Sequence, residues 1–128
     1  MTGRAVTAPD VPDPVPGLFS NAVLRDGILY VSGMHAGGAG PVPADMLEQA
    51  RTALRRVVAL VEAAGGTAGD VVRITVYVTD MSQKAAVAQA RREVFAQAPL
   101  PAATMVAVTA FVAPDLLVEV DAVAHVAP

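Results

Sequence analysis

The chain has 128 residues, enough for one domain with a hydrophobic core. It is 54% hydrophobic but only 4% aromatic, with no Trp and no Cys, so the core has to be built from Val, Ala, Leu and Met. The lack of cysteine excludes thiol nucleophiles, disulfides and cysteine-ligated metals. The net charge of −3, without a basic cluster, argues against a nucleic-acid partner.

The apolar runs are too short for the roughly 20 residues that cross a bilayer, so we expect no membrane partner. The surplus of apolar side chains then suggests a subunit interface. The first 15 residues contain prolines and no long apolar stretch, which is unlike a secretion signal, and we expect a cytoplasmic protein.

The N-terminal part predicts an irregular segment followed by a hairpin. Residues 1–17 are expected to be irregular because prolines disfavour both helix and central strand. Residues 18–24 and 28–34 predict two strands, joined by the favoured two-residue turn Asp26-Gly27. Ser32-Gly33 inside the second strand indicates a bulge or the close approach of another group.

The middle of the chain predicts a glycine-rich loop and a helix. Residues 35–43 lack the Lys-Ser/Thr pair of a phosphate-binding loop, so we interpret them as a flexible connection. Residues 44–64 have helical spacing of apolar side chains, and Gly65-Gly66 is typical of a helix end. The buried side is expected to carry Leu47, Ala50, Leu54, Val57, Val58 and Val61, and the arginines Arg51, Arg55 and Arg56 are expected on the solvated side.

A strand and a second helix follow. Residues 70–79 alternate strictly, with Val72, Ile74, Val76 and Val78 predicted to face the core. Residues 84–97 predict a helix that begins after a cap at Asp80 or Ser82. Its buried stripe is expected to be Val87, Ala90, Val94 and Phe95.

Residues 100–126 predict two strands joined by a turn at Ala113-Pro114-Asp115. Because a strand has a period of two, Glu119, Asp121 and His125 project from one face of the last strand. No other strand of this chain places three ionisable groups on one face, so we expect any reactive site there. The element order is ββαβαββ, an α+β fold in which two helices cover one face of a five- or six-stranded sheet.

Several stretches, in this order and spacing, resemble the Rid (YjgF) family of reactive intermediate deaminases over residues 18–126. They are Leu29-Tyr30-Val31-Ser32-Gly33, Gln49-Ala50-Arg51, Val61-Glu62-Ala63-Ala64-Gly65, Gly69 through Met81, and Val118 through Ala124. The resemblance implies one chorismate-mutase-like domain assembled as a homotrimer. It also implies pockets at the subunit interfaces that hydrolyse small enamines and imines such as 2-aminoacrylate, without metal or cofactor.

The sequence departs from the family pattern at two positions. The deaminases of the family hold the substrate carboxylate with an arginine in a Pro-Ala-Arg-Ser/Thr motif, whereas this chain has Pro101-Ala102-Ala103-Thr104. Alanine cannot replace the bidentate arginine–carboxylate contact. Phe19 stands where the family usually has a tyrosine. The glutamate that positions or activates water in the family matches Glu119.

These considerations give a set of candidate site residues. We expect Glu119 to act in acid/base catalysis, with Asp121 as a second carboxylate or as a bonding partner of a neighbouring strand. His35 is either a proton shuttle or a loop residue without a role. The predicted substrate-binding residues are Phe19, Ser32, Gly33, Met34, His35, Ala103 and Met105, and no metal site is expected.

Three functions remain open from the sequence. The leading hypothesis is a divergent enzyme acting on an imine, an enamine or a related reactive metabolite that lacks the usual carboxylate or holds it differently. The alternatives are a non-catalytic trimer that binds a metabolite or regulates a partner, and an isomerase or cyclase of a biosynthetic pathway on the same scaffold.

Overall fold

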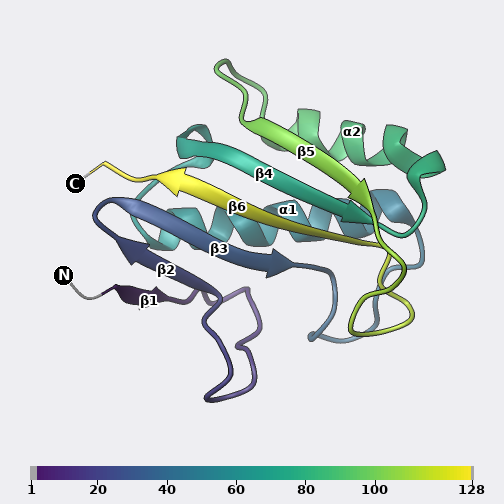
Figure 1. Ribbon diagram of the computed structural model, residues 1–128, viewed down its shortest axis with the longest axis horizontal. Helices are drawn as coiled ribbons and strands as arrows, with labels where there is room; N and C mark the ends of the chain where they lie inside the picture. Colours follow the sequence, from purple (N-terminus) through teal and green to yellow (C-terminus); the bar gives the residue numbers. More distant parts are fainter. Residues whose placement is uncertain (1–2, 128) are drawn as a thin grey trace.

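The computed structural model describes residues 3–127 and contains one six-stranded sheet with the strand order β1-β2-β3-β6-β4-β5. Helices α1 (Met46–Ala63) and α2 (Lys84–Val94) lie on the same face of this sheet (Figure 1). The predicted α+β class with one helix-covered face is therefore confirmed. The strands are β1 (Arg4–Val6), β2 (Ala22–Arg25), β3 (Ile28–Met34), β4 (Val71–Val78), β5 (Ala102–Ala107) and β6 (Val118–His125), and 3₁₀ turns η1 (Ala68–Asp70) and η2 (Met81–Gln83) precede β4 and α2.

The N-terminal segment is more ordered than predicted. The expectation of an irregular segment is wrong for Arg4–Val6, because this short strand pairs antiparallel with β2 at the edge of the sheet. Strand β2 begins at Ala22 rather than at residue 18. Leu18 and Phe19 lie in the preceding connection, where both side chains are more than half exposed.

The predicted hairpin and bulge are both present. Asp26 and Gly27 have positive φ angles of 52° and 77°, as a two-residue turn between β2 and β3 requires. The pairing of β3 with β6 shifts register between Val31 and Met34. The irregularity predicted from Ser32-Gly33 is therefore confirmed.

Helix α1 has a capping arrangement at each end, of which only the glycine pair was predicted. The Asp45 side chain accepts a hydrogen bond from the backbone N–H of Glu48 at 2.7 Å and caps the first turn. At the other end Gly65 has a φ of 98°, and the N–H groups of Gly65 and Gly66 donate to the carbonyls of Glu62 and Val61. This is the Schellman arrangement, so the glycine pair ends the helix as predicted.

Helix α2 is shorter than predicted, and it ends at Val94 instead of residue 97. The chain leaves helical geometry at Phe95, whose side chain is only 8% exposed and packs into the core. The ring is therefore buried as expected, from a position just beyond the helix.

The last two strands do not pair with each other. Strand β5 pairs in parallel with β4, and β6 lies antiparallel between β3 and β4. The two strands predicted from residues 100–126 exist, but β4 separates them. Residues 108–117 connect them without forming the tight turn that a hairpin would need.

One core prediction in β4 is wrong. The register of β4 against β6 shifts between Val71 and Arg73. Val71 is consequently buried and Val72 is 43% exposed, contrary to the expected alternation, whereas Ile74, Val76 and Val78 are fully buried as predicted.

A buried glutamine connects α1 to two loops at one end of the sheet. Gln49 has no exposed surface. Its Nε2 donates to the carbonyls of Pro43 and Asp115, each at 2.8 Å, and its Oε1 accepts from the N–H of Leu117 at 2.8 Å. All three bonds go to loop backbone, so they satisfy the buried amide of Gln49 and hold the two loops against α1.

The sheet face opposite the helices stays uncovered in the single chain. It combines exposed apolar side chains, among them Tyr30 at 51% and Val106 at 39%, with polar residues of β4 and β6. An apolar surface of this kind is typical of an interaction face.

Candidate active site

Glu119 lies over the backbone of Gly33. It is half-buried on the uncovered sheet face, between buried Val118 and Val120 that point to the helices. A Cβ atom built on Gly33 would lie 2.4 Å from Oε2 of Glu119. The bulge in β3 and the missing side chain at Gly33 together leave room for this carboxylate.

Asp121, the second predicted carboxylate, accepts a hydrogen bond from a tyrosine. The hydroxyl of Tyr77 on β4 donates to Oδ2 of Asp121 at 2.8 Å. This hydrogen bond, together with burial, raises the pKa of Tyr77 above its usual value. The phenol therefore stays protonated at neutral pH, and Asp121 acts as an acceptor within the sheet face.

His35 is held in one tautomer by its own loop. Its Nδ1 accepts a hydrogen bond from the N–H of Gly37 at 3.0 Å, so the ring proton resides on Nε2. Burial lowers the pKa of His35 below its usual value, Arg56 lowers it further, and Glu119 opposes both effects. The ring is therefore neutral at pH 7 and offers an N–H donor.

Arg56 of α1 binds the backbone of the loop that contains His35. Its Nη1 donates to the backbone carbonyls of His35 and, at 2.6 Å, of Gly37. The expectation that Arg56 belongs to the solvated side of the helix is therefore wrong. Nothing in the sequence indicated this, because the burial of Gln49, seven residues earlier on the same face of the helix, is itself seen only in the structure.

A cleft of about 360 Å³ lies between this loop and the N-terminal connection. Four of the predicted substrate-binding residues line it, namely Phe19, Gly33, Met34 and His35. The remaining lining residues were not predicted from the sequence: Val11, Pro12, Asp13, Pro14, Val15, Leu18, Asn21, Gly37, Gly38, Arg56 and Val112. Met34 itself is only 5% exposed and belongs mainly to the core.

The other three predicted binding residues lie elsewhere. The hydroxyl of Ser32 donates to the carbonyl of Ser20 at 2.6 Å and joins β3 to the N-terminal connection. Ala103 and Met105 belong to β5, on the far side of β4 from Glu119. Within one chain, the candidate residues therefore form two separate groups.

Two classes of site are not found in the described part of the chain. Among residues 3–127 no three His, Asp or Glu side chains gather closely enough to ligate a metal ion. Neither helix in this range combines the length and apolar character needed to cross a membrane.

Comparisons with known proteins agree on one family. A family model described as endoribonuclease L-PSP matches residues 11–126. The 2-iminobutanoate/2-iminopropanoate deaminase of Escherichia coli is 41% identical over 87 residues, which cover 66% of this chain and 67% of that protein.

Solved structures extend the likeness to the whole fold. Rv2704 of Mycobacterium tuberculosis, described as a member of the YjgF/YER057c/UK114 family, is 35% identical with a TM-score of 0.79, covering 95% of this chain and 100% of that one. Escherichia coli TdcF, crystallised with bound serine, is 28% identical with a TM-score of 0.89, covering 97% of this chain and 99% of that one. The chain belongs to the Rid (YjgF) family.

Proposed function

We propose that this chain hydrolyses a small reactive imine or enamine to a carbonyl compound and ammonia, in a pocket between the subunits of a homotrimer. The observation that carries the proposal is the half-buried carboxylate of Glu119 above Gly33, at the position where the family resemblance expects its acid/base group. The deaminase name of the relative that is 41% identical supports the same reaction class.

The reaction needs one proton carrier and one water molecule. The Glu119 carboxylate accepts a proton from water as the water oxygen bonds to the C=N carbon. The same group returns this proton to nitrogen, which gives a carbinolamine. It then takes the proton of the new hydroxyl group and passes it to nitrogen, so that the C–N bond breaks, ammonia leaves and the C=O bond forms. An enamine first takes up a proton at carbon and gives up one from nitrogen to become the imine. General acid/base assistance of this kind contributes roughly 10²- to 10⁴-fold to a rate.

The sheet register supports a pocket shared between chains. Glu119 lies in one row with Tyr77 and Val106, and Ala103 lies three residues earlier on β5. Strand spacings place the two Cα atoms on the order of 14 Å apart. Ala103 is also in register with buried Ile74 and faces the helix side, whereas Glu119 faces the opposite side. A pocket that uses both therefore needs a second chain.

The uncovered sheet face supports the same assembly. Tyr30 and Val106 expose apolar surface there, next to the polar pair formed by Tyr77 and Asp121. Packing of this face against neighbouring subunits would bury the apolar side chains and remove bulk water from Glu119.

Ala103 and Phe19 favour a second candidate function. Both positions lack the polar group that the family resemblance expects, which reduces the contacts available to a polar substrate. A trimer that binds a metabolite without converting it is consistent with these losses.

Ammonia release from 2-iminobutanoate, generated in the assay by an amino-acid oxidase, tests the proposal. We expect the wild-type protein to accelerate release and Glu119→Gln to lose roughly 100-fold or more in kcat. Glu62→Gln, an exposed position of α1, is the matched control and should keep wild-type turnover. Full activity of Glu119→Gln would refute the assigned role, and an inactive wild-type protein that binds the product 2-oxobutanoate would favour the binding function.

A further inference from the structure

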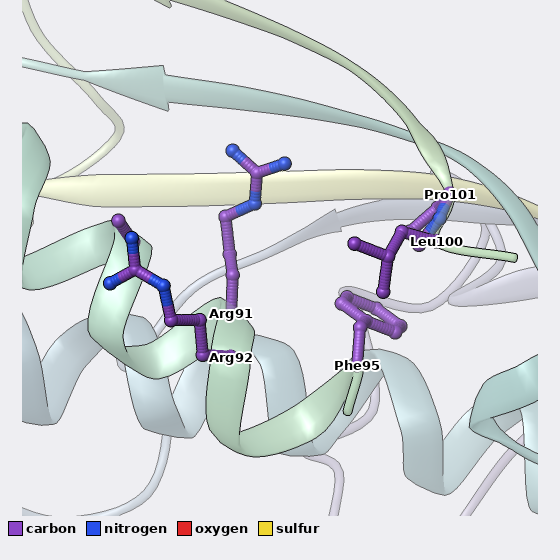
Figure 2. Close-up of a pocket in the computed structure, with 6 residues that line it drawn as sticks. Arg91, Arg92, Phe95, Leu100 and Pro101 are labelled. Atoms are coloured by element: carbon purple, nitrogen blue, oxygen red, sulfur yellow. The ribbon is translucent and has the colours of Figure 1, made fainter. Parts of the chain in front are cut away.

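A hollow of about 260 Å³ lies between α2 and the start of β5. Figure 2 shows the side chains around it, with two arginines on α2 and an apolar group formed by Phe95, Leu100 and Pro101. Its volume lies just below the usual range of pockets for drug-sized ligands, which suits a small metabolite.

The positive charge of this hollow has no partner in the described part of the chain. None of the hydrogen bonds or ion pairs found among residues 3–127 involves the side chain of Arg91 or Arg92. The neighbouring acid of α2, Glu93, instead accepts two hydrogen bonds of 2.8 Å from Arg51 of α1. A guanidinium group at this site is therefore available to an anion.

The opposite wall of the hollow is apolar. The Phe95 side chain is 8% exposed and is held in the core, whereas the Leu100 side chain is 63% exposed and can contact a ligand. A guanidinium group on one side of the hollow, with a phenyl ring and an exposed leucine on the other, matches a ligand with a carboxylate at one end and a short hydrocarbon chain at the other.

The hollow also borders the motif that has lost its arginine. Pro101 is the first residue of Pro101-Ala102-Ala103-Thr104, and it contributes to the lining. Ala103 is exposed and in register with Ile74, so its methyl group lies on the helix-covered face. Arg91 reaches toward the same face from α2 (Figure 2).

We infer that Arg91 supplies the carboxylate anchor that Ala103 cannot. This inference rests on the proposed function, in which the reacting pocket is shared between subunits. Arg91 is assigned rather than Arg92 because, in Figure 2, the Arg91 side chain extends toward the strands while that of Arg92 projects away from Leu100 and Pro101.

Binding of 2-oxobutanoate, the stable keto acid that hydrolysis would produce, tests the anchor without any turnover. Isothermal titration of the full-length protein should show binding that Arg91→Gln weakens roughly 10- to 100-fold, the range for loss of a hydrogen bond to a charged group. The uncharged amide of 2-oxobutanoate should bind both proteins equally. Arg55→Gln removes one charge from the exposed side of α1 and should leave the affinity unchanged.

A charge-relocation variant controls for misfolding. Adding Ala103→Arg to Arg91→Gln should restore most of the lost affinity, which a general packing defect would not allow. Unchanged affinity in Arg91→Gln, an equal loss in Arg92→Gln, or no binding by the wild-type protein would each overturn the assignment.

The binding and ammonia-release experiments separate the two proposals. If Arg91 governs keto-acid binding but the wild-type protein releases no ammonia, the anchor stands and the proposed hydrolysis fails. If ammonia is released but Arg91→Gln has no effect, the hydrolysis stands and the anchor fails.

Discussion

The carboxylate of Glu119 occupies the space that a side chain at Gly33 would need. An ideal Cβ atom at Gly33 would lie 2.4 Å from Oε2 and 2.7 Å from Cδ of Glu119. The two residues come from neighbouring strands, β3 and β6, and meet next to the bulge of β3. The position of the proposed acid/base group therefore depends on the absence of a methyl group on the adjacent strand.

Gly33→Ala is expected to impair turnover more than stability. The added methyl group displaces the flexible end of Glu119, and a misplacement of about 1 Å in a catalytic group can cost up to 10²-fold in rate. We expect kcat to fall by at least about tenfold in the ammonia-release assay, with little change in the thermal midpoint. Gly69→Ala is the control, because its nearest neighbour would be 3.6 Å away. Wild-type kcat in Gly33→Ala would show that this position of Glu119 does not matter.

The stability of the protein is expected to fall in mild acid because of His35. Burial lowers the pKa of His35 in the folded chain, whereas the unfolded chain takes up a proton near pH 6.5. Below that pH the unfolded state binds more protons, so stability decreases as the pH falls toward the folded pKa and then levels off. Urea unfolding at pH 7.5 and 5.5 should show a smaller loss in His35→Gln than in wild type. Equal losses would contradict this assignment.

Gln49→Met is expected to destabilise the fold strongly. The substitution removes the three hydrogen bonds that the buried Gln49 side chain makes to the carbonyls of Pro43 and Asp115 and to the N–H of Leu117. Each such bond contributes about 1 kcal/mol net, so the loss in the free energy of unfolding should be about 3 kcal/mol. Urea unfolding of the variant measures it. The control, Gln89→Met on the exposed side of α2, should change stability by less than about 0.5 kcal/mol.

The uncovered sheet face is expected to hold the trimer together. Tyr30→Glu places a charge on a side chain that is 51% exposed in the single chain but buried in the proposed assembly. Sedimentation equilibrium should give three chains for the wild-type protein and smaller species for Tyr30→Glu. Ala63→Glu, at the exposed end of α1 on the other side of the sheet, should remain trimeric. A wild-type protein that sediments as one chain would refute the shared pocket.

Much of the fold could be predicted because the local signals are strong. The Asp26-Gly27 turn and the Gly65-Gly66 helix end require backbone geometry that few residues other than glycine adopt, and both lie where the sequence indicated. The exposure of Val72 could not be predicted, because it results from a bulge in the pairing of β4 with β6 and nothing in the local sequence marks that bulge.

The candidate site was less accessible to sequence reasoning. Glu119 and Gly33 were each singled out, but their contact depends on strand order and register, which alternation along one strand does not determine. Arg56 and Arg91 look like ordinary surface residues of helices. Only the folded chain shows that Arg56 binds a loop and that Arg91 borders a hollow.

The placement of β6 has a consequence for how the protein is made. Strand β6 is the last of the six strands along the chain, yet it lies inside the sheet, between β3 and β4 (Figure 1). Until β6 has been made and has paired, β3 and β4 each present an open edge that can pair with other chains. The sheet is therefore completed late in folding, and a partly folded chain exposes two edges that are prone to aggregation.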